Sequence, residues 1–238
     1  MTAPDEARAI VLARIRSALG VATLDRARRS AVARRLERHP RSTIPAQAVQ
    51  SLAGCVARLD EMLTKQGAEV ARVATPEDAV HAIASYLSSN NLPPRLRMGG
   101  DLPLAALPWR EAWDIGRVFG RAEPTDKACL SRALVAAAET GTLFLASGAE
   151  NPTTLNFLPE IHMVLIRTSD IVGSYEEALN RLRGVYGERS LPRSINLISG
   201  PSRTADIEQT IVRGAHGPRR LHVLILGGME ARRAPPAP

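Results

Sequence analysis

Short apolar runs that alternate with amphipathic helical segments are the feature of this 238-residue chain that most constrains its fold. The runs at 142–146, 162–166 and 221–226 have the length of β-strands and are almost wholly apolar. Because such strands bury both of their faces, they are typical of mostly parallel sheets that helices cover on each side. The sequence therefore predicts an α/β fold with a mostly parallel sheet flanked by helices.

The helical segments carry their own start signals. Residues 75–78 read Thr-Pro-Glu-Asp, which places a hydroxyl cap, a proline at the first helical position and two acids in the first turn. Apolar residues at helical spacing predict two further helices, from about 46 to 67 and from 174 to 186. Residues 125–138 are rich in small side chains and are predicted to be partly helical.

The amino-terminal part carries most of the net charge. Residues 1–44 contain ten arginines and four acids, and so account for +6 of the chain's net charge of +7. They contain no aromatic residue, although basic residues interleaved with aromatics are typical of nucleic-acid-binding surfaces. We expect an arginine-rich helical arm at 1–44, which is either simply solvated or docked onto an acidic partner, and no nucleic-acid ligand. An α/β domain at 45–228 and a disordered tail at 229–238 complete the predicted organisation.

Composition also limits the chemistry. Cys55 and Cys129 are the only cysteines and form no Cys-x-x-Cys motif, so we expect no disulfide, no metal site and no cofactor such as an iron–sulfur cluster held by this chain. Lys65 and Lys127 are the only lysines, which makes a Schiff-base mechanism unattractive, and no P-loop motif is present. No apolar run approaches the roughly 20 residues that span a bilayer, and the first residues show no signal pattern. We expect a cytoplasmic protein with no membrane partner.

Three loops contain residues suited to binding or catalysis, and in open α/β sheets ligands bind beyond the carboxyl ends of the strands. The first loop precedes the strand predicted at 142–146. Its Gly141 permits an unusual backbone angle, Thr140 and Thr142 offer hydroxyls, and Glu139 offers a carboxylate for acid–base or covalent chemistry. The alternative is an ordinary helix-to-strand turn in which Gly141 caps the helix.

The second loop follows the strand-like run 195–198. Glycine, hydroxyls and an expected helix start resemble an anion cradle, in which backbone N–H groups point at a phosphate or carboxylate. Arg203 would add a bidentate clamp. The alternative has Ser202 or Thr204 capping a short helix whose first turn Asp206 stabilises. The candidate residues of this loop are Gly200, Pro201, Ser202, Arg203, Thr204, Asp206 and Glu208.

The third loop holds His216 between small and rigid neighbours, Gly217 and Pro218. A histidine held in this way would serve as a general base or as a hydrogen-bond donor, and the alternative is a surface turn. His162 and His222 lie in strand-like runs, where we expect core or edge positions rather than catalytic ones. The polar residues between 151 and 159 are expected to form a rim or lid, and a Ser-His-Asp hydrolase is disfavoured because no Gly-x-Ser-x-Gly elbow is present.

Five short motifs, in matching order and spacing over roughly residues 120–226, resemble the LUD domain of the lactate utilization protein C family. They are Ala-Glu-Thr-Gly-Thr at 138–142, Leu-Pro-Glu-Ile-His at 158–162, Ile-Ser-Gly-Pro-Ser at 198–202 with 204–208, the run 213–219, and 221–223. The arm at 10–15 is also similar to that family. The resemblance implies a fold similar to the superfold shared by sugar-phosphate isomerases and CoA-transferases.

The resemblance further implies a role in oxidising L-lactate to pyruvate together with partner subunits that carry iron–sulfur clusters. The leading hypothesis is a non-redox subunit of that system, with Glu139, Asp206 and His216 as candidate catalytic residues. The expected contacts to a small anionic ligand are Thr140, Gly141, Thr142, Gly200, Pro201, Ser202, Arg203, Thr204, Glu208 and Gly217. Two alternatives stay open: a free-standing enzyme of CoA-transferase or isomerase type that uses Glu139, and a scaffold whose arm recruits the iron–sulfur subunit.

Overall fold

The computed structural model describes residues 3–20, 25–109, 114–187, 190–205 and 211–227. The chain separates into two compact units, residues 1–43 and residues 44–238. The predicted tail at 229–238 lies outside the described residues.

The first unit contains the two helices predicted for the arm, α1 (Ala3–Ala18) and α2 (Arg26–Arg38). The side chain of Asp25 caps α2 by accepting a hydrogen bond from the backbone N–H of Arg28 at 3.0 Å. No described residue of α2 is buried, and Val32 and Leu36 are 55% and 68% exposed. The arm therefore presents apolar side chains among its arginines.

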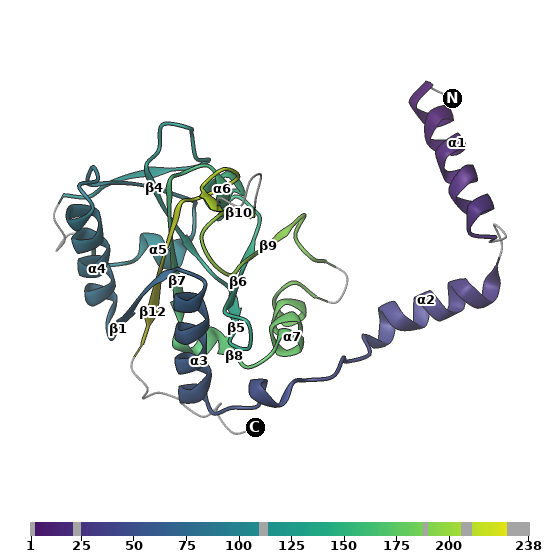
Figure 1. Cartoon of the computed structure of the whole chain (residues 1–238), viewed down its shortest axis with the longest axis horizontal. Helices are drawn as coiled ribbons and strands as arrows, with labels where there is room; N and C mark the ends of the chain where they lie inside the picture. The colour runs from purple at the N-terminus through teal and green to yellow at the C-terminus, as the bar shows by residue number, and fades with distance from the viewer. Residues whose placement is uncertain (1–2, 21–24, 110–113, 188–189, 206–210, 228–238) are drawn as a thin grey trace. The chain divides into compact units, whose positions relative to one another are not determined.

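A six-stranded sheet in the order β1-β12-β7-β4-β2-β3 forms the centre of the second unit. All five pairings between these strands are parallel, which confirms the predicted α/β fold (Figure 1). In sheet order the strands are β1 (Glu69–Val73), β12 (Arg220–Leu226), β7 (Ile161–Arg167), β4 (Ala128–Arg132), β2 (Arg95–Met98) and β3 (Gly116–Phe119).

Helices cover both faces of this sheet. Met163 and Leu165 of β7 belong to the hydrophobic cluster that contains α4 (Pro76–Ser89), whereas Val164 and Ile166 belong to the cluster that contains α3 (Leu52–Lys65). Successive side chains of a strand point to opposite faces, so this alternation is what a strand buried on both sides produces. The predicted start of α4 is confirmed, because Thr75 and Asp78 form a reciprocal capping box and Pro76 occupies the first turn.

A second sheet of four strands lies beside the first, in the order β8-β5-β6-β9. Its strands are β5 (Val135–Ala137), β6 (Thr142–Ala146), β8 (Ile171–Val172) and β9 (Ile195–Ile198), and α7 (Tyr175–Tyr186) packs against it. Strand β6 pairs antiparallel with both β5 and β9, so the run 142–146 is a buried strand outside the parallel sheet.

Two local predictions were wrong. Residues 125–138 were predicted to be partly helical, but they form β4 and β5. Their small side chains favour a helix only weakly, and burial between neighbouring strands overrides that preference. The loop after β9 was expected to start a helix, but it leads into a hairpin of β10 (Arg203–Ala205) and β11 (Ile211–Arg213).

The remaining described elements are short: η1 (Ala46–Ala48), α5 (Leu102–Ala105), α6 (Thr154–Phe157) and η3 (Thr168–Asp170). None of the helices within the described residues is long and apolar enough to cross a membrane.

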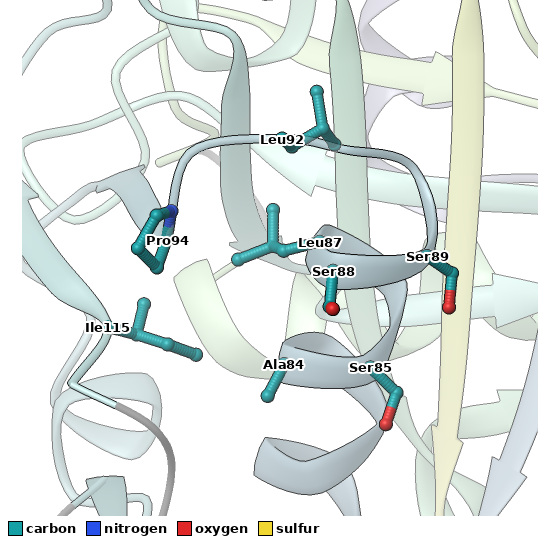
Figure 2. Close-up of a pocket in the computed structure, with 8 residues that line it drawn as sticks. All are labelled: Ala84, Ser85, Leu87, Ser88, Ser89, Leu92, Pro94 and Ile115. Carbon is teal, nitrogen blue, oxygen red and sulfur yellow. The ribbon is translucent and has the colours of Figure 1, made fainter.

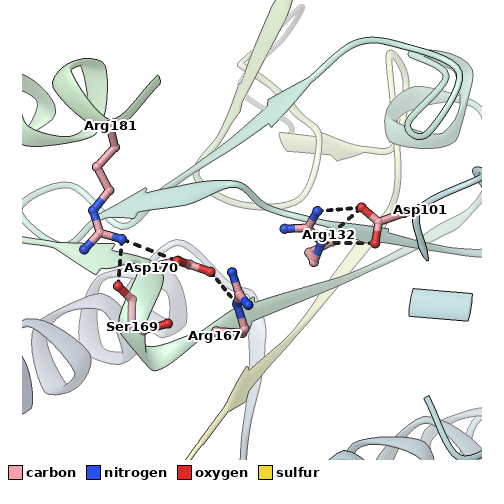
Figure 3. A network of polar contacts seen from close by, with 6 residues as sticks. All are labelled: Asp101, Arg132, Arg167, Ser169, Asp170 and Arg181. Atoms are coloured by element: carbon pink, nitrogen blue, oxygen red, sulfur yellow. Dashed lines mark hydrogen bonds and ion pairs between the residues drawn. The ribbon is translucent and has the colours of Figure 1, made fainter. Parts of the chain in front are cut away.

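Ion pairs fix the segments that follow the parallel strands (Figure 3). Arg132, at the end of β4, donates two hydrogen bonds from Nε and one from Nη2 to the carboxylate of Asp101, at 2.8–3.0 Å. Arg167, at the end of β7, donates to Asp170 at 2.7 Å, and Arg181 of α7 contacts the same carboxylate at 3.4 Å. The carboxyl edge of the sheet is thereby occupied by the protein's own charge pairs.

Candidate functional site

A cavity of about 210 Å³ brings the second and third predicted loops together with the starts of two central strands. It is lined by Asn156, Phe157, His162, Leu197, Ile198, Ser199, Gly200, Pro201, Ser202, His216, Gly217, Pro218 and Leu221. A cavity of this size suits a small metabolite rather than a nucleotide. Five predicted site residues, Gly200, Pro201, Ser202, His216 and Gly217, are among the lining residues.

The cavity lies at the amino ends of the parallel strands. His162 is the second residue of β7 and Leu221 the second residue of β12, and the two are paired in register. The second predicted loop follows the carboxyl end of β9, whose Leu197 and Ile198 also line the cavity. A site beyond the carboxyl ends of the parallel strands stays a prediction. The loop from 199 to 218 precedes β12, so it closes over the edge at which β12 begins.

Two buried polar side chains in the cavity wall have polar atoms without a partner. Asn156 and His162 are each 1% exposed. The Oδ1 atom of Asn156 accepts a hydrogen bond from the hydroxyl of Ser131 at 3.3 Å. Its Nδ2 atom and both ring nitrogens of His162 have no hydrogen-bond partner among the described residues. Leaving a buried group unsatisfied costs about 1–3 kcal/mol, so these atoms call for a partner that the described residues do not supply.

Burial keeps the imidazole of His162 neutral, because desolvation lowers its pKa to about 3. A neutral imidazole offers one N–H donor and one acceptor nitrogen. The wall of the cavity therefore carries uncharged hydrogen-bonding groups.

Backbone hydrogen bonds hold the loops around the cavity. The N–H of Ser202 donates to the carbonyl of Pro218 at 2.8 Å, and the N–H of Gly214 donates to the carbonyl of Ser202 at 3.0 Å. Gly217 favours this close approach, because a Cβ there would lie 3.3 Å from the Cβ of Ser202, a tight contact. His216 is exposed at the mouth, next to these fixed residues.

The first predicted loop reaches the cavity only through a cluster of hydroxyls. The Oγ1 atom of Thr142 lies 2.7 Å from Ser199 Oγ and 2.8 Å from Thr140 Oγ1. The Tyr175 hydroxyl donates to the same Thr142 oxygen at 2.8 Å. Of these four residues only Ser199 lines the cavity, so the cluster orients Ser199 from behind.

Glu139 is buried away from the cavity lining. Its Oε1 atom accepts a hydrogen bond from the N–H of Tyr175 at 2.8 Å, in the first turn of α7. A carboxylate in that position stabilises the amino end of a helix. The arrangement therefore gives Glu139 a structural contact.

The remaining predicted residues gather at the carboxyl end of α3. A Cβ added at Gly141, which has φ +68°, would lie 2.7 Å from the Cβ of Met62, and one added at Gly200 would lie 3.0 Å from the Cβ of Gln66. The exposed Arg203 places its guanidinium against Gly67, just after that helix, where a cation favours the carbonyl end. Arg203 does not line the cavity.

The structure does not describe the side chains of three further predicted residues. Thr204 is placed by its backbone in β10, and Asp206 and Glu208 lie outside the described residues. Only part of the predicted rim between 151 and 159 lies at the cavity. Asn156 and Phe157 line it, and Asn151 does not. The amide of Asn151 instead donates to the carbonyl of Ala146 at 3.2 Å.

Sequence reasoning placed Asn156 only in a rim, and it did not include His162, Ser199 or Tyr175 among the candidate site residues. A polar residue inside an otherwise apolar strand was the available signal for His162. That signal does not say which loops cover the strand. The contribution of Ser199 and Tyr175 depends on strand pairing that brings residues 142 and 199 together.

A larger cavity of about 480 Å³ lies beside α4 (Figure 2). It is lined by Ala84, Ser85, Leu87, Ser88, Ser89, Leu92, Pro94 and Ile115. None of these residues is ionisable near neutral pH, and all have aliphatic or small hydroxyl side chains. The smaller cavity is therefore the better candidate for specific chemistry.

Comparisons with known proteins give the family. The family model of the LUD domain matches residues 125–226. A protein of Neisseria meningitidis is 44% identical over 89 residues, which are 37% of each chain, and lactate utilization protein C of Anoxybacillus flavithermus is 33% identical over 116 residues, 48% of this chain and 51% of the relative. These matches thus span about a third to a half of the relatives' lengths.

Lactate utilization protein C of Halalkalibacterium halodurans is matched more fully, with 31% identity over 179 residues, 71% of this chain and 77% of that protein. A crystal structure of a DUF162 family protein from Deinococcus radiodurans shares the fold, with a TM-score of 0.56 and 23% identity over 75% of this chain and 99% of that one. On these matches, and on the LUD domain at its carboxyl-terminal half, the chain belongs to the lactate utilization protein C family.

Proposed function

We propose that this chain is a non-redox component of a cytoplasmic L-lactate utilization system and that it binds a small carboxylate in the 210 Å³ cavity. The names of its relatives supply the pathway. The observation that carries the binding proposal is the pair of buried residues Asn156 and His162, which belong to the cavity lining and have side-chain polar atoms without a partner among the described residues.

The cavity is suited to a carboxylate by its donors. Its lining residues include Asn156, with an amide, His162, with a neutral imidazole, and Ser199 and Ser202, with hydroxyls. Neutral donors of this kind can pair with a carboxylate, although Phe157 and Leu197 in the lining are 43% and 52% exposed and leave the cavity open to solvent. Arg203 has no place in this proposal as a clamp, since its guanidinium lies against Gly67.

The non-redox role is supported by the state of the two thiols. Cys55 and Cys129 are both buried, and burial raises the pKa of each thiol. A metal cluster requires thiolates, which these environments disfavour. In our proposal the iron–sulfur clusters and the electron transfer belong to partner subunits, and the arginine-rich arm docks onto an acidic surface of one of them.

A free-standing enzyme that uses Glu139 as its catalytic carboxylate is the less favoured alternative. The Glu139 carboxylate accepts from the backbone of α7 and does not line the cavity. A covalent adduct trapped on Glu139 would restore that alternative.

Calorimetric titration of L-lactate into the full chain tests the proposal. We expect saturable binding, and we expect Asn156→Leu to weaken it at least about tenfold, because an amide donor to a carboxylate is lost. Ser88→Ala, in the larger cavity beside α4, is the matched control and should bind as wild type does. An absence of binding by the wild type, or wild-type affinity in Asn156→Leu, would contradict the proposal.

A further inference from the structure

Helix α2 of the arm is crowded with positive charge. It contains six arginines and one glutamate among its 13 residues, and no described residue of it is buried. Arg34 and Arg38 are four residues apart and Arg35 and Arg38 three, and like charges at these spacings destabilise an isolated helix. A helix of this length is also only marginally stable by itself in water. Helix α2 therefore gains stability from a partner that supplies negative charge.

An apolar stripe runs along the same helix. Val32 and Leu36 are four residues apart, so they lie on one face, and they are 55% and 68% exposed. Arg28 and Arg29 precede Val32 by four and three residues, and Arg35 follows it by three. At 100° per residue these arginines lie on both sides of the stripe. The face thus combines two aliphatic side chains with a border of cations.

Helix α1 repeats this arrangement. Val11 and Ile15, with Leu19 just beyond the helix, recur every four residues and are 56%, 49% and 66% exposed. Arg8 precedes Val11 by three residues and Arg14 follows it by three, so the two arginines lie on opposite sides of the stripe. Single exposed apolar residues are ordinary, but the same stripe on two helices of one unit indicates a binding surface.

The composition of the arm distinguishes three kinds of negatively charged partner. Residues 1–44 contain ten arginines but no lysine, tryptophan, tyrosine or phenylalanine. Helices that lie on membranes commonly insert tryptophan or phenylalanine, and proteins that bind single-stranded nucleic acids stack bases on aromatic rings. The phosphates of a duplex would pair with the arginines but would leave Val32 and Leu36 in water. A protein with an apolar groove bordered by carboxylates suits both, because arginine pairs with carboxylates in a bidentate manner.

We infer that the arm binds as a helix in the groove of an acidic protein, with Val32 and Leu36 on the apolar floor and the bordering arginines on carboxylates at its edges. This inference rests on the proposed function, in which the arm docks onto an acidic surface, and adds that the contact is apolar at its centre. Salt screens ion pairs between exposed charges and does not screen apolar burial. The association should therefore keep part of its strength at high salt.

Calorimetric titration of the full chain with two acidic probes tests the inference. Calcium-loaded calmodulin is acidic and exposes apolar grooves, whereas poly-L-glutamate is acidic and has none. We expect calmodulin to bind at least about ten times more tightly, because burying two aliphatic side chains contributes that much or more. Equal affinities for the two probes would overturn the inference. Association with phosphatidylglycerol vesicles or duplex DNA, but not with calmodulin, would overturn it as well.

A double variant locates the apolar contact. Val32→Ala combined with Leu36→Ala removes the stripe and keeps residues that favour a helix. We expect calmodulin to bind this variant at least about tenfold more weakly and poly-L-glutamate to bind it as before. Val185→Ala is the matched control, because Val185 is 66% exposed on α7 of the other unit. Unchanged affinity of the double variant for calmodulin would overturn the assignment to this face.

Titration of L-lactate into the same double variant separates this inference from the proposed function. The arm belongs to a separate compact unit, so L-lactate should bind the double variant as it binds the wild type. If calmodulin does not bind the wild type but L-lactate does, the inference fails and the carboxylate site stands. If calmodulin binds and L-lactate does not, the carboxylate site fails and the groove-binding role of the arm is supported.

Discussion

His162 and His222 show how similar residues in similar strands differ in what surrounds them. Both are buried, and the ring nitrogens of His162 lack a hydrogen-bond partner among the residues described, whereas the ring of His222 contacts the backbone of Glu69. The ring of His222 stacks on Tyr86 with centroids 4.1 Å apart, which gives it a packing role. His162 lines the cavity instead. The neighbouring loops, rather than the strand, make one of them a site residue.

The two histidines make stability depend on pH. Burial lowers the pKa of His162 to about 3 and that of His222 to about 4, whereas an unfolded histidine titrates near 6.5. Below pH 6.5 the unfolded chain therefore binds more protons than the folded chain, and the free energy of unfolding falls as pH decreases. Each histidine contributes a loss of about 1.4 kcal/mol per pH unit until its folded pKa is reached.

Between pH 6.5 and pH 5 the free energy of unfolding should fall in both proteins. We expect it to fall by about 2 kcal/mol less in His162→Leu than in the wild type. Urea unfolding of both proteins at the two pH values measures this difference. Comparing the two proteins cancels the carboxylates, which titrate alike in each. Equal acid sensitivity would show that His162 is not buried in its neutral form.

The hydroxyl cluster gives a second prediction for single residues. Tyr175→Phe removes one donor to Thr142 and keeps the ring, so we expect the free energy of unfolding to fall by about 1 kcal/mol. We also expect a several-fold loss of L-lactate affinity, because Ser199 is then less well oriented. Tyr186→Phe on the same helix is the control. If Tyr175→Phe binds L-lactate as tightly as the wild type does, the hydroxyl cluster does not contribute to binding.

At the scale of elements, Gly141 shows why the turn between β5 and β6 tolerates few substitutions. Its φ of +68° disfavours any residue with a side chain, and a Cβ would also lie 3.0 Å from the backbone nitrogen of Leu63. We expect Gly141→Ala to lower the free energy of unfolding by about 2 kcal/mol or more, through strain and overlap together.

Substituting two further glycines distinguishes backbone strain from steric overlap, with stability measured by chemical denaturation. Gly187 has φ +84° and open space around a Cβ, so Gly187→Ala should show strain alone, about 1 kcal/mol. Gly148 has neither strain nor overlap, and Gly148→Ala should be close to neutral. A Gly141→Ala variant as stable as Gly148→Ala would contradict the packing of this turn on α3.

How much could be predicted from sequence differs between these elements. The start of α4 was predicted in detail, because a hydroxyl cap, a proline and two acids act within one turn. Strands β4 and β5 were missed, because alanine-rich segments carry little local preference and pairing with distant strands decides their structure. The loop residues of the cavity were found by composition. Asn156 was expected in a rim, whereas His162 was expected in a core or edge position, because only the topology places its strand opposite that loop.

At the scale of the whole molecule, the arm and the α/β unit are separate compact units. We expect deletion of residues 1–43 to leave the unfolding midpoint of the α/β unit and its affinity for L-lactate unchanged. Association with an acidic iron–sulfur partner should be lost, and analytical ultracentrifugation of the mixture would measure it. Loss of L-lactate binding on deletion would show that the arm takes part in the site.

The central claim is that a small carboxylate binds between the 199–218 loop and the starts of β7 and β12. A crystal structure of the full chain with L-lactate tests it most directly. We predict electron density for the ligand in the 210 Å³ cavity, beside Asn156 and His162. Ligand density at the carboxyl edge near Arg132, or an unliganded cavity at saturating L-lactate, would contradict the account.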